Sequence, residues 1–362
     1  MKNTTTRPTW LLHLALIVGQ IFFGMGSVIA GLGLPACNPF AFALYREIAA
    51  GTILLSLSVF YLDSNSNKSW IILSIQKPHW NRFLLLGLAI FGNQAGMIAG
   101  IKLAGPVAAA VWQPSQPIMT AAIGMVLGWE PWRRTRIAGI VISFLGCASM
   151  VLLSTTTTTT ATTTITNSMT SILTGHALFF MNCLSTSIYV LLSKAPLRIY
   201  SPLLVTAWSY VIASMFMAIT TYILTWSSDI MFFLCPDCQG PWNIPSGAWF
   251  ALFYFILFGS VGAYALLTWA NSQAATGTLV ISYTVLQPVT AAILTMTMLS
   301  FRWYPNCQTT EQHVAYCLTP PGLQSILGMA GIFTGLALVI RTEPPPSLAK
   351  ADELEMMVVG ME

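Results

Sequence analysis

Gln-Pro pairs interrupt two apolar runs that are long enough to cross a bilayer. The pairs Gln113-Pro114 and Gln116-Pro117 lie within 110–122, near the middle of the first run, and the pair Gln287-Pro288 lies in the second run, 278–300. A Gln amide both donates and accepts hydrogen bonds, and Pro frees a backbone carbonyl one turn earlier because it has no N–H. Within a membrane such groups must face protein or a water-filled space. We therefore interpret the three Gln as substrate-binding residues and the three Pro as helix kinks.

An aromatic residue precedes one Gln of each run by four positions, Trp112 before Gln116 and Tyr283 before Gln287. Residues four apart lie on the same face of a helix. We expect the aromatic rings to cover the apolar part of a solute while the amides contact its polar part. The alternative is that Pro only kinks each helix and that Gln bonds a neighbouring helix.

Arg46 and Glu47 are the charged residues that lie well inside an apolar run. A charge in this position costs about 2.5 to 3.5 kcal/mol on an insertion scale, so it needs a use or a partner. Adjacent residues point to different helix faces and do not form the usual i, i+4 pair. We expect Arg46 to bind a substrate carboxylate, or Glu47 to carry a coupling proton. The alternative is that both side chains snorkel to the membrane interface.

The composition indicates that lipid surrounds these residues. Of 362 residues, 55% are hydrophobic and 7% are charged, whereas about a quarter of the residues in a soluble protein are charged. We predict an all-α polytopic membrane protein with ten transmembrane helices of roughly 20 residues. The runs are 10–34, 39–62, 82–104, 106–128, 135–153, 172–193, 202–226, 247–270, 278–300 and 323–341.

The positive charges predict the orientation of these helices. With the N-terminus in the cytoplasm, most Lys and Arg outside the spans fall on the cytoplasmic side, and only Lys102 and Arg302 fall on the other. Cytoplasmic loops carry such an excess. The asymmetry accounts for the net charge of +4, so we expect no nucleic acid partner. Both termini are expected in the cytoplasm.

Five cysteines fall in loops that this orientation places outside. They are Cys37, Cys235, Cys238, Cys307 and Cys317. The last four are candidates for disulfides in a secretory-pathway compartment, and the alternative is that they are unpaired. The C-x-x-C spacing at 235–238 lacks a second pair of ligands at metal spacing, so we expect no metal site.

The chain divides into two similar halves around a Thr-rich stretch, 154–168. Pro39 aligns with Pro202 at an offset of 163, and Gln116-Pro117 aligns with Gln287-Pro288 at an offset of 171. Gly139 and Gly146 align with Gly328 and Gly335 at an offset of 189. Because each unit holds five spans, the second unit must be inverted in the membrane. The predicted parts are a cytoplasmic N-terminus (1–9), a first repeat (10–153), a linker (154–170), a second repeat (171–341) and an acidic cytoplasmic tail (342–362).

An inverted repeat with matched polar kinks is typical of a secondary transporter, in which the solute binds where the repeats meet. An enzyme is disfavoured, because the spans contain no Asp and no cluster of His or carboxylates. We expect no cofactor. A non-transporting receptor or scaffold remains an alternative. A nucleotide-sugar or sugar-phosphate carrier is less favoured, because phosphate recognition uses Arg or Lys and the second half has no basic residue inside a span.

The stretch LAGPVAAAVWQPSQPIMTAAIGMVLGWEPWRRTRIAGIVISFLG resembles the end of an EamA domain of the drug/metabolite transporter superfamily. YREIAAG and NCLSTSIYVLLSKAPLRIYSPLLVTAW are most similar to its plant nodulin-type, walls-are-thin-related branch. The resemblance implies ten helices around a central cavity and movement of small organic solutes such as amino acids or auxin-like compounds. Glu130 matches the acidic residue of the first repeat's loop, whereas LSFRWYPNC in the second half has no Glu. No organelle leader is recognised before Trp10, so we expect the plasma or vacuolar membrane.

Overall fold

The structure, a computed structural model, describes residues 9–33, 37–63, 75–129, 133–156, 169–235, 238, 240–303 and 323–341. All secondary structure in these ranges is helical. The elements are α1 (Thr9–Gly33), α2 (Pro39–Asp63), η1 (Lys77–His79), α4 (Trp80–Trp112), α5 (Ser115–Val126), α6 (Arg134–Thr156), α7 (Met169–Leu197), α8 (Pro202–Thr225), α9 (Ser228–Leu234), η2 (Ser246–Ala248), α10 (Trp249–Tyr254), η3 (Phe255–Gly262), α11 (Ala263–Gln273), α12 (Gly277–Ser282), η4 (Tyr283–Val285), α13 (Leu286–Ser300) and α14 (Leu323–Arg341). Glu130, Cys307, Cys317, most of the Thr-rich linker and the acidic tail lie outside the described residues.

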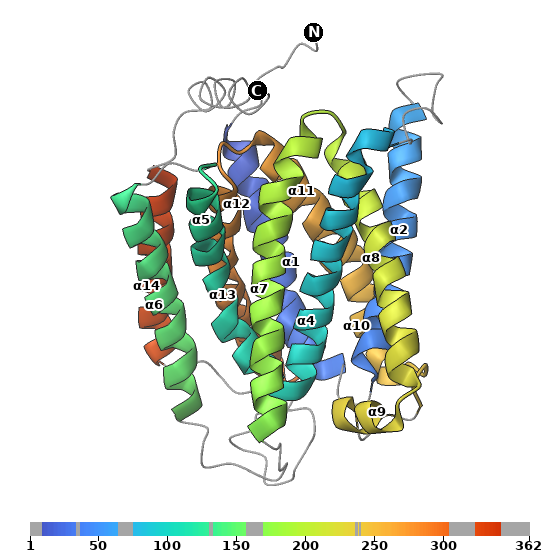
Figure 1. Cartoon of the computed structure of the whole chain (residues 1–362). Helices are drawn as coiled ribbons and strands as arrows, with labels where there is room; N and C mark the ends of the chain where they lie inside the picture. The colour runs from blue at the N-terminus through green and yellow to red at the C-terminus, as the bar shows by residue number, and fades with distance from the viewer. Residues whose placement is uncertain are drawn as a thin grey trace.

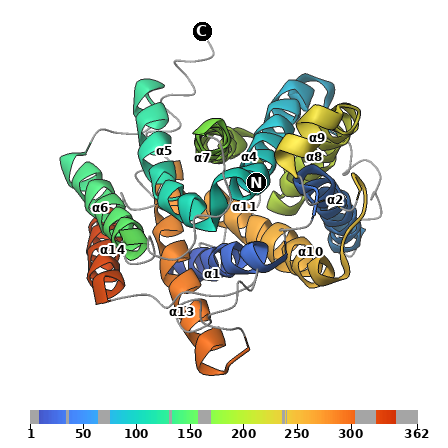
Figure 2. The same cartoon turned by 90° about the horizontal axis from the view of Figure 1, so that it is seen from below.

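The long helices lie side by side in one bundle (Figure 1). Seen along the bundle, α6 and α14 form one edge, α2 and α8 form the opposite edge, and α1, α4 and α11 lie between them (Figure 2). Within the described residues, seven helices are long and apolar enough to cross a membrane. The protein is therefore a polytopic helical membrane protein. The other three expected spans contain α5, α6 and α14.

The chain reverses direction before α4 ends, between Ala104 and Trp112, where the expected third and fourth spans meet. Gln113 Nε2 lies 3.4 Å from the sulfur of Met97, whereas sixteen residues of straight helix would separate them by about 24 Å. The contacts of α7 agree. Its Gly175 packs against Ala104, and its Cys183, two turns further on, bonds the carbonyl of Trp112. The segment that leads into α5 thus runs back alongside the first part of α4.

Proline positions account for two interruptions of the helices. Pro117 and Pro288 cannot donate to the carbonyls four residues earlier, those of Gln113 and Thr284. At Gln113 the helix gives way to a turn between α4 and α5, in which the Gln116 N–H bonds the Gln113 carbonyl at 3.1 Å. At Thr284 it tightens into the 3-10 segment η4 between α12 and α13. Gln116-Pro117 and Gln287-Pro288 therefore lie just after a break in the helix, and Gln113-Pro114 lies in the first break.

Glycine packing joins α6 to α14. A Cβ atom added at Gly139 would lie 2.8 Å from the carbonyl oxygen of Gly335, and one added at Gly146 would lie 2.8 Å from that of Gly328. Such distances are too short for any side chain, so the backbones approach closely only because these residues are Gly. The two helices form a tight pair at one edge of the bundle (Figures 1 and 2).

Candidate functional site

A cavity of about 60 Å³ with several polar lining residues lies among α1, α2, α4, α5, α7, η3, α11, α12, η4 and α13. Four of the residues expected to contact a solute line it, namely Gln113, Gln116, Gln287 and Arg46. They come from sequence positions up to 241 residues apart. A volume of this size holds a few water molecules, whereas pockets for organic ligands measure about 300 to 1,000 Å³. The cavity must therefore widen before a solute can occupy it.

A chain of amides forms one wall of the cavity. Gln116 Nε2 donates to Gln113 Oε1 at 2.5 Å, and Gln113 Nε2 donates to Asn182 Oδ1 at 3.2 Å. Asn182 Nδ2 in turn donates to the backbone carbonyl of Asn93 at 2.8 Å. The Oδ1 atom of Asn93 accepts a 2.6 Å bond from the Tyr264 hydroxyl. These bonds tie α5, α7, α4 and α11 together and fix the direction in which each amide points.

The equivalent segment of the second half forms another part of the wall. Gln287 Nε2 donates to Gln20 Oε1 at 2.7 Å, which attaches α13 to α1. Thr284, three residues before Gln287, also lines the cavity. Its buried hydroxyl oxygen has no hydrogen-bond partner in the structure. Buried polar atoms are rarely left unpaired, so this hydroxyl offers a contact for a solute or a water molecule.

Arg46 enters the cavity from α2 and is held by two residues of η3. Its Nε donates to Ser260 Oγ at 2.7 Å, and its guanidinium lies 4.8 Å from the centre of the Phe255 ring. Only 3% of Arg46 is exposed. η3 is a π-helix. Its i→i+5 hydrogen bonds bring residues that are five apart toward the same face of the helix. In an α-helix, the side chains of two such residues would point about 140° apart. The wide turn therefore lets Phe255 and Ser260 meet the same guanidinium.

Glu47 is fully buried next to Arg46 but does not line the cavity. Neither carboxyl oxygen has a hydrogen-bond partner. A buried, unpaired carboxylate costs several kcal/mol even after relaxation of the surroundings. The burial of both residues in protein disagrees with the alternative in which they snorkel to the interface.

Trp112 and Tyr283 are not among the residues that line the cavity. Trp112 Nε1 donates to His176 Nδ1 at 2.9 Å, and the Tyr283 hydroxyl lies 2.6 Å from His13 Nδ1. Each aromatic ring thus binds a His from the first helix of the other half of the chain. The contact of either ring with a solute stays a prediction.

Several polar lining residues were not foreseen from the sequence. They are Gln20, Asn93, Gln94, Asn182 and Thr284. None belongs to a Gln-Pro pair, although Asn93 and Gln94 are adjacent and Asn182 opens the stretch NCLSTSIYVLL. The useful signal would have been the amide itself, because an Asn or Gln in the middle of a span requires a partner.

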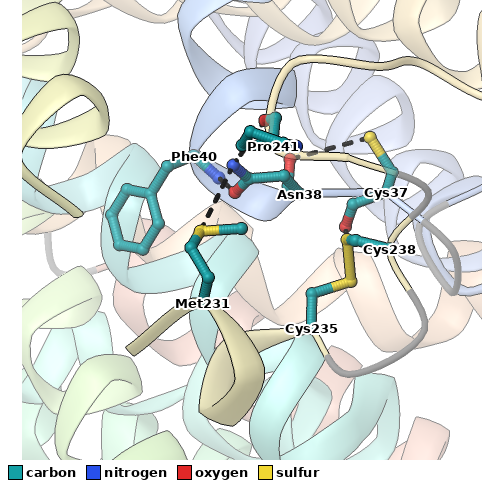
Figure 3. The surroundings of a disulfide bond; sticks show 7 residues. All are labelled: Cys37, Asn38, Phe40, Met231, Cys235, Cys238 and Pro241. Carbon is teal, nitrogen blue, oxygen red and sulfur yellow. Dashed lines mark hydrogen bonds between the residues drawn. A yellow bond between two sulfur atoms is a disulfide. The ribbon is translucent and has the colours of Figure 1, made fainter. Parts of the chain in front are cut away.

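A disulfide between Cys235 and Cys238 lies in the segment that follows α9 (Figure 3). Beside it, Asn38 Nδ2 donates to the carbonyl of Pro241 at 2.7 Å, which holds the start of α2 to this segment. Cys37 is a buried free cysteine at the same place. Burial raises the pKa of its thiol to about 11, and the positive charge of Lys102 opposes this effect.

Comparison with known proteins agrees with this architecture. Residues 10–152 match the model of the EamA-like transporter family. Over these residues the chain is similar to the EamA-like transporters. This match supports the resemblance to the drug/metabolite transporter superfamily, and the nodulin-type branch stays a prediction. The match and the apolar helices support a multi-pass membrane transporter.

Two individual proteins are similar to this EamA-like chain. The uncharacterized transporter YyaM of Bacillus subtilis (strain 168) is 22% identical over 254 residues, which cover 70% of this chain and 75% of YyaM. A solved crystal structure superposes with a TM-score of 0.59 at 15% identity, over 91% of this chain and 96% of the other. At this identity the superposition shows a shared fold.

Proposed function

We propose that this protein is a secondary transporter that binds a small organic solute in the central cavity and exposes it alternately to the two sides of the membrane. The observation that carries the proposal is the meeting of Gln116 and Gln287 in the lining of one cavity. These residues occupy equivalent positions of the two halves, 171 apart. Interrupted helices at equivalent positions of two repeats are the expected setting of a transport site.

We propose ten membrane-crossing segments arranged as two inverted repeats, 10–153 and 171–341. The packing of α6 on α14 supports this arrangement. Gly139 and Gly328 are equivalent, as are Gly146 and Gly335. The contacts join Gly139 to Gly335 and Gly146 to Gly328. Such a reciprocal exchange of partners is what a two-fold axis between the helices generates.

The proposed solute has a carboxylate, a second polar group and an apolar part, as amino acids and auxin-like compounds do. A guanidinium has five N–H donors, and the bond to Ser260 uses one, so Arg46 can bind a carboxylate as well. The three Gln and Thr284 would contact the other polar group. Phe23 and Phe255 line the cavity and would contact the apolar part.

We propose that Glu47 carries the coupling proton. A neutral carboxyl group avoids the cost of a buried charge, so Glu47 would be protonated in the conformation described here. The groups that interact with it electrostatically are Arg46, Tyr210 and Tyr264. When the cavity opens to water on one side of the membrane, Glu47 would release its proton. The ionised Glu47 would then favour the uptake of a proton from the other side.

The proposed orientation puts both termini in the cytoplasm of a cell whose plasma or vacuolar membrane holds the protein. The segment that follows α9 would then lie outside, where a disulfide such as Cys235–Cys238 persists. A nucleotide-sugar or sugar-phosphate carrier is the second candidate. It is less supported, because Arg46 is the one basic residue among those that line the cavity.

Uptake by proteoliposomes tests the proposal. Radiolabelled amino acids, auxin-like acids and nucleotide sugars are offered with and without a proton gradient. We expect accumulation of a carboxylate-bearing solute, stronger with the gradient, and its loss in Arg46→Gln. Uptake of nucleotide sugars alone would favour the second candidate. Binding of a solute without any uptake would favour a receptor.

A further inference from the structure

Two hydrogen bonds between His and an aromatic residue are related by the repeat. His13 and His176 are 163 residues apart, the offset that also aligns Pro39 with Pro202. Trp112 and Tyr283 are 171 apart, the offset of the two Gln-Pro pairs. His13 bonds Tyr283, and His176 bonds Trp112. Each bond therefore joins the first helix of one half to the interrupted helix of the other half.

The two bonds lie toward opposite ends of the bundle. His176 is near the start of α7, and Lys194 near its end is about 27 Å further along the helix. Lys194 Nζ donates to the carbonyls of Ala274 and Ala275 at 2.8 and 3.3 Å, just before α12 leads into Tyr283. α1 and α12 begin at the end of the bundle opposite to the start of α7 (Figure 1).

Each bond also lies four residues along the chain from a Gln of the cavity wall. Gln116 follows Trp112 by four residues, and Gln287 follows Tyr283 by four. Gly24, on the same helix as His13, leaves no room for a side chain beside Gln287 and Thr290. Separation of His13 from Tyr283 would thus let α1 move away from α13 next to the lining. With both bonds formed, the cavity has about 60 Å³.

We propose that these two hydrogen bonds are the two gates of the transport cycle. The first gate, His13–Tyr283, closes the path from the cavity to the membrane face where α1 begins. The second gate, His176–Trp112, closes the path to the opposite face. The proposal rests on the proposed transport function, and alternating access then requires that one gate opens while the other stays closed.

Two conservative substitutions remove one hydrogen bond each and keep an aromatic ring. Tyr283→Phe deletes the hydroxyl of the first gate, and Trp112→Phe deletes the indole N–H of the second. The reporter is Ser27→Cys, which lines the cavity. An impermeant thiol reagent is added to one face of proteoliposomes of known orientation, and labelling of residue 27 is followed by peptide mass spectrometry.

We expect each variant to speed labelling about fivefold, the equivalent of a hydrogen bond of about 1 kcal/mol. Tyr283→Phe should do so only from the face where α1 begins, and Trp112→Phe only from the opposite face. Tyr254→Phe is the matched control, because the Tyr254 hydroxyl also bonds α1, at the carbonyl of Phe22 and 2.8 Å away, but belongs to neither gate.

Labelling that increases from the same face in both gate variants, or in neither, overturns the proposal. An increase in labelling in Tyr254→Phe equal to that in Tyr283→Phe also overturns the proposal. The assay needs no transported solute, so the gates can fail while uptake by the wild-type protein stands. If the proposed function is wrong, the wild-type protein should show no uptake, while each gate variant should still be labelled faster from its own face. Equal thermal unfolding midpoints would show that the variants fold.

Discussion

Gln287 of α13 donates a 2.7 Å hydrogen bond to the side-chain carbonyl of Gln20 in α1. The two residues come from opposite halves of the chain and both line the cavity. Gln116, the counterpart of Gln287, instead donates to its own neighbour Gln113. The two halves thus use equivalent amides in different ways, and the consequences of removing them differ.

Replacement of Gln116 or Gln287 by Leu should raise the KM for the transported solute about tenfold. A lost or unpaired buried amide costs about 1 to 3 kcal/mol. Gln287→Leu should also lower the thermal unfolding midpoint, because it leaves Gln20 without its donor on α13. Initial uptake rates and a melting curve measure both effects. The exposed Gln273 is the control, since Gln273→Leu should leave KM unchanged. A wild-type KM in the double Leu variant would remove both Gln from the site.

Arg46→Lys and Arg46→Gln should form a graded series. A charge-assisted hydrogen bond is worth about 1.5 to 3 kcal/mol, so Arg46→Gln should weaken binding of a carboxylate-bearing solute by ten- to a hundredfold. Lys keeps the charge but loses the planar geometry, so its effect should be smaller. Binding is measured by isothermal titration in detergent, with the amide analogue of the solute as control. Equal losses for acid and amide would mean that Arg46 does not contact the carboxylate.

Glu47→Gln should separate binding from coupling. Gln has almost the shape of a protonated Glu, so the protein should fold and exchange solute across the membrane at about the wild-type rate. Accumulation driven by a proton gradient should disappear. Counterflow exchange and gradient-driven uptake are compared in the same vesicles. Gradient-driven accumulation at the wild-type level in Glu47→Gln would assign coupling to another group.

Gly139→Ala should destabilise the pair of α6 and α14. A Cβ atom at this position would lie 2.8 Å from the Gly335 carbonyl oxygen, and overpacking of this kind costs about 1 to 3 kcal/mol. A lower thermal unfolding midpoint is the expected result. Gly247→Ala is the control, because a Cβ atom there has no neighbour within 4 Å. Similar midpoints for the two variants would contradict close packing of the helices.

Cys37 should resist alkylation at neutral pH. Its thiol pKa of about 11 is above the ordinary value of 9.0. The thiolate is the reactive form, so at pH 8 its fraction is about one in a thousand, a hundredfold below that of an ordinary thiol. The rate should rise about tenfold per pH unit until pH 11, because a raised pKa delays ionisation. Iodoacetamide labelling of folded and denatured protein measures this. Equal rates at pH 8 would show that Cys37 is not protected.

The sequence predicted those parts of the cavity that follow from local patterns. Gln116, Gln287 and Arg46 were identifiable because a polar group inside an apolar run demands a partner, whatever the surrounding fold. The positions of Trp112 and Tyr283 were not, because four-residue spacing gives the same face only while the helix continues. In both cases the helix changes its pitch within those four residues.

Contacts between distant segments were beyond the reach of sequence patterns. The reversal between Ala104 and Trp112 was predictable, because Gly105-Pro106 separates the expected third and fourth spans, but the packing of the returning segment on α7 was not. The partners of Arg46 depend on a π-helix, for which composition gives no signal. The amide of Asn182 could be recognised as buried, but not that its partners come from α4 and α5.

The π-helix η3 has a consequence for how this chain tolerates insertions and deletions. A wide turn contains one more residue than an α-helical turn of the same height. Loss of one residue between Phe255 and Gly262 would therefore shorten the chain without moving the ends of the membrane-crossing segment. Because the wide turn would then become an α-helical turn, the later side chains of α11 would keep their directions. Loss of one residue from α10 would instead turn them by about 100°, Tyr264 would leave Asn93, and the lineage that lost this residue would have a different cavity.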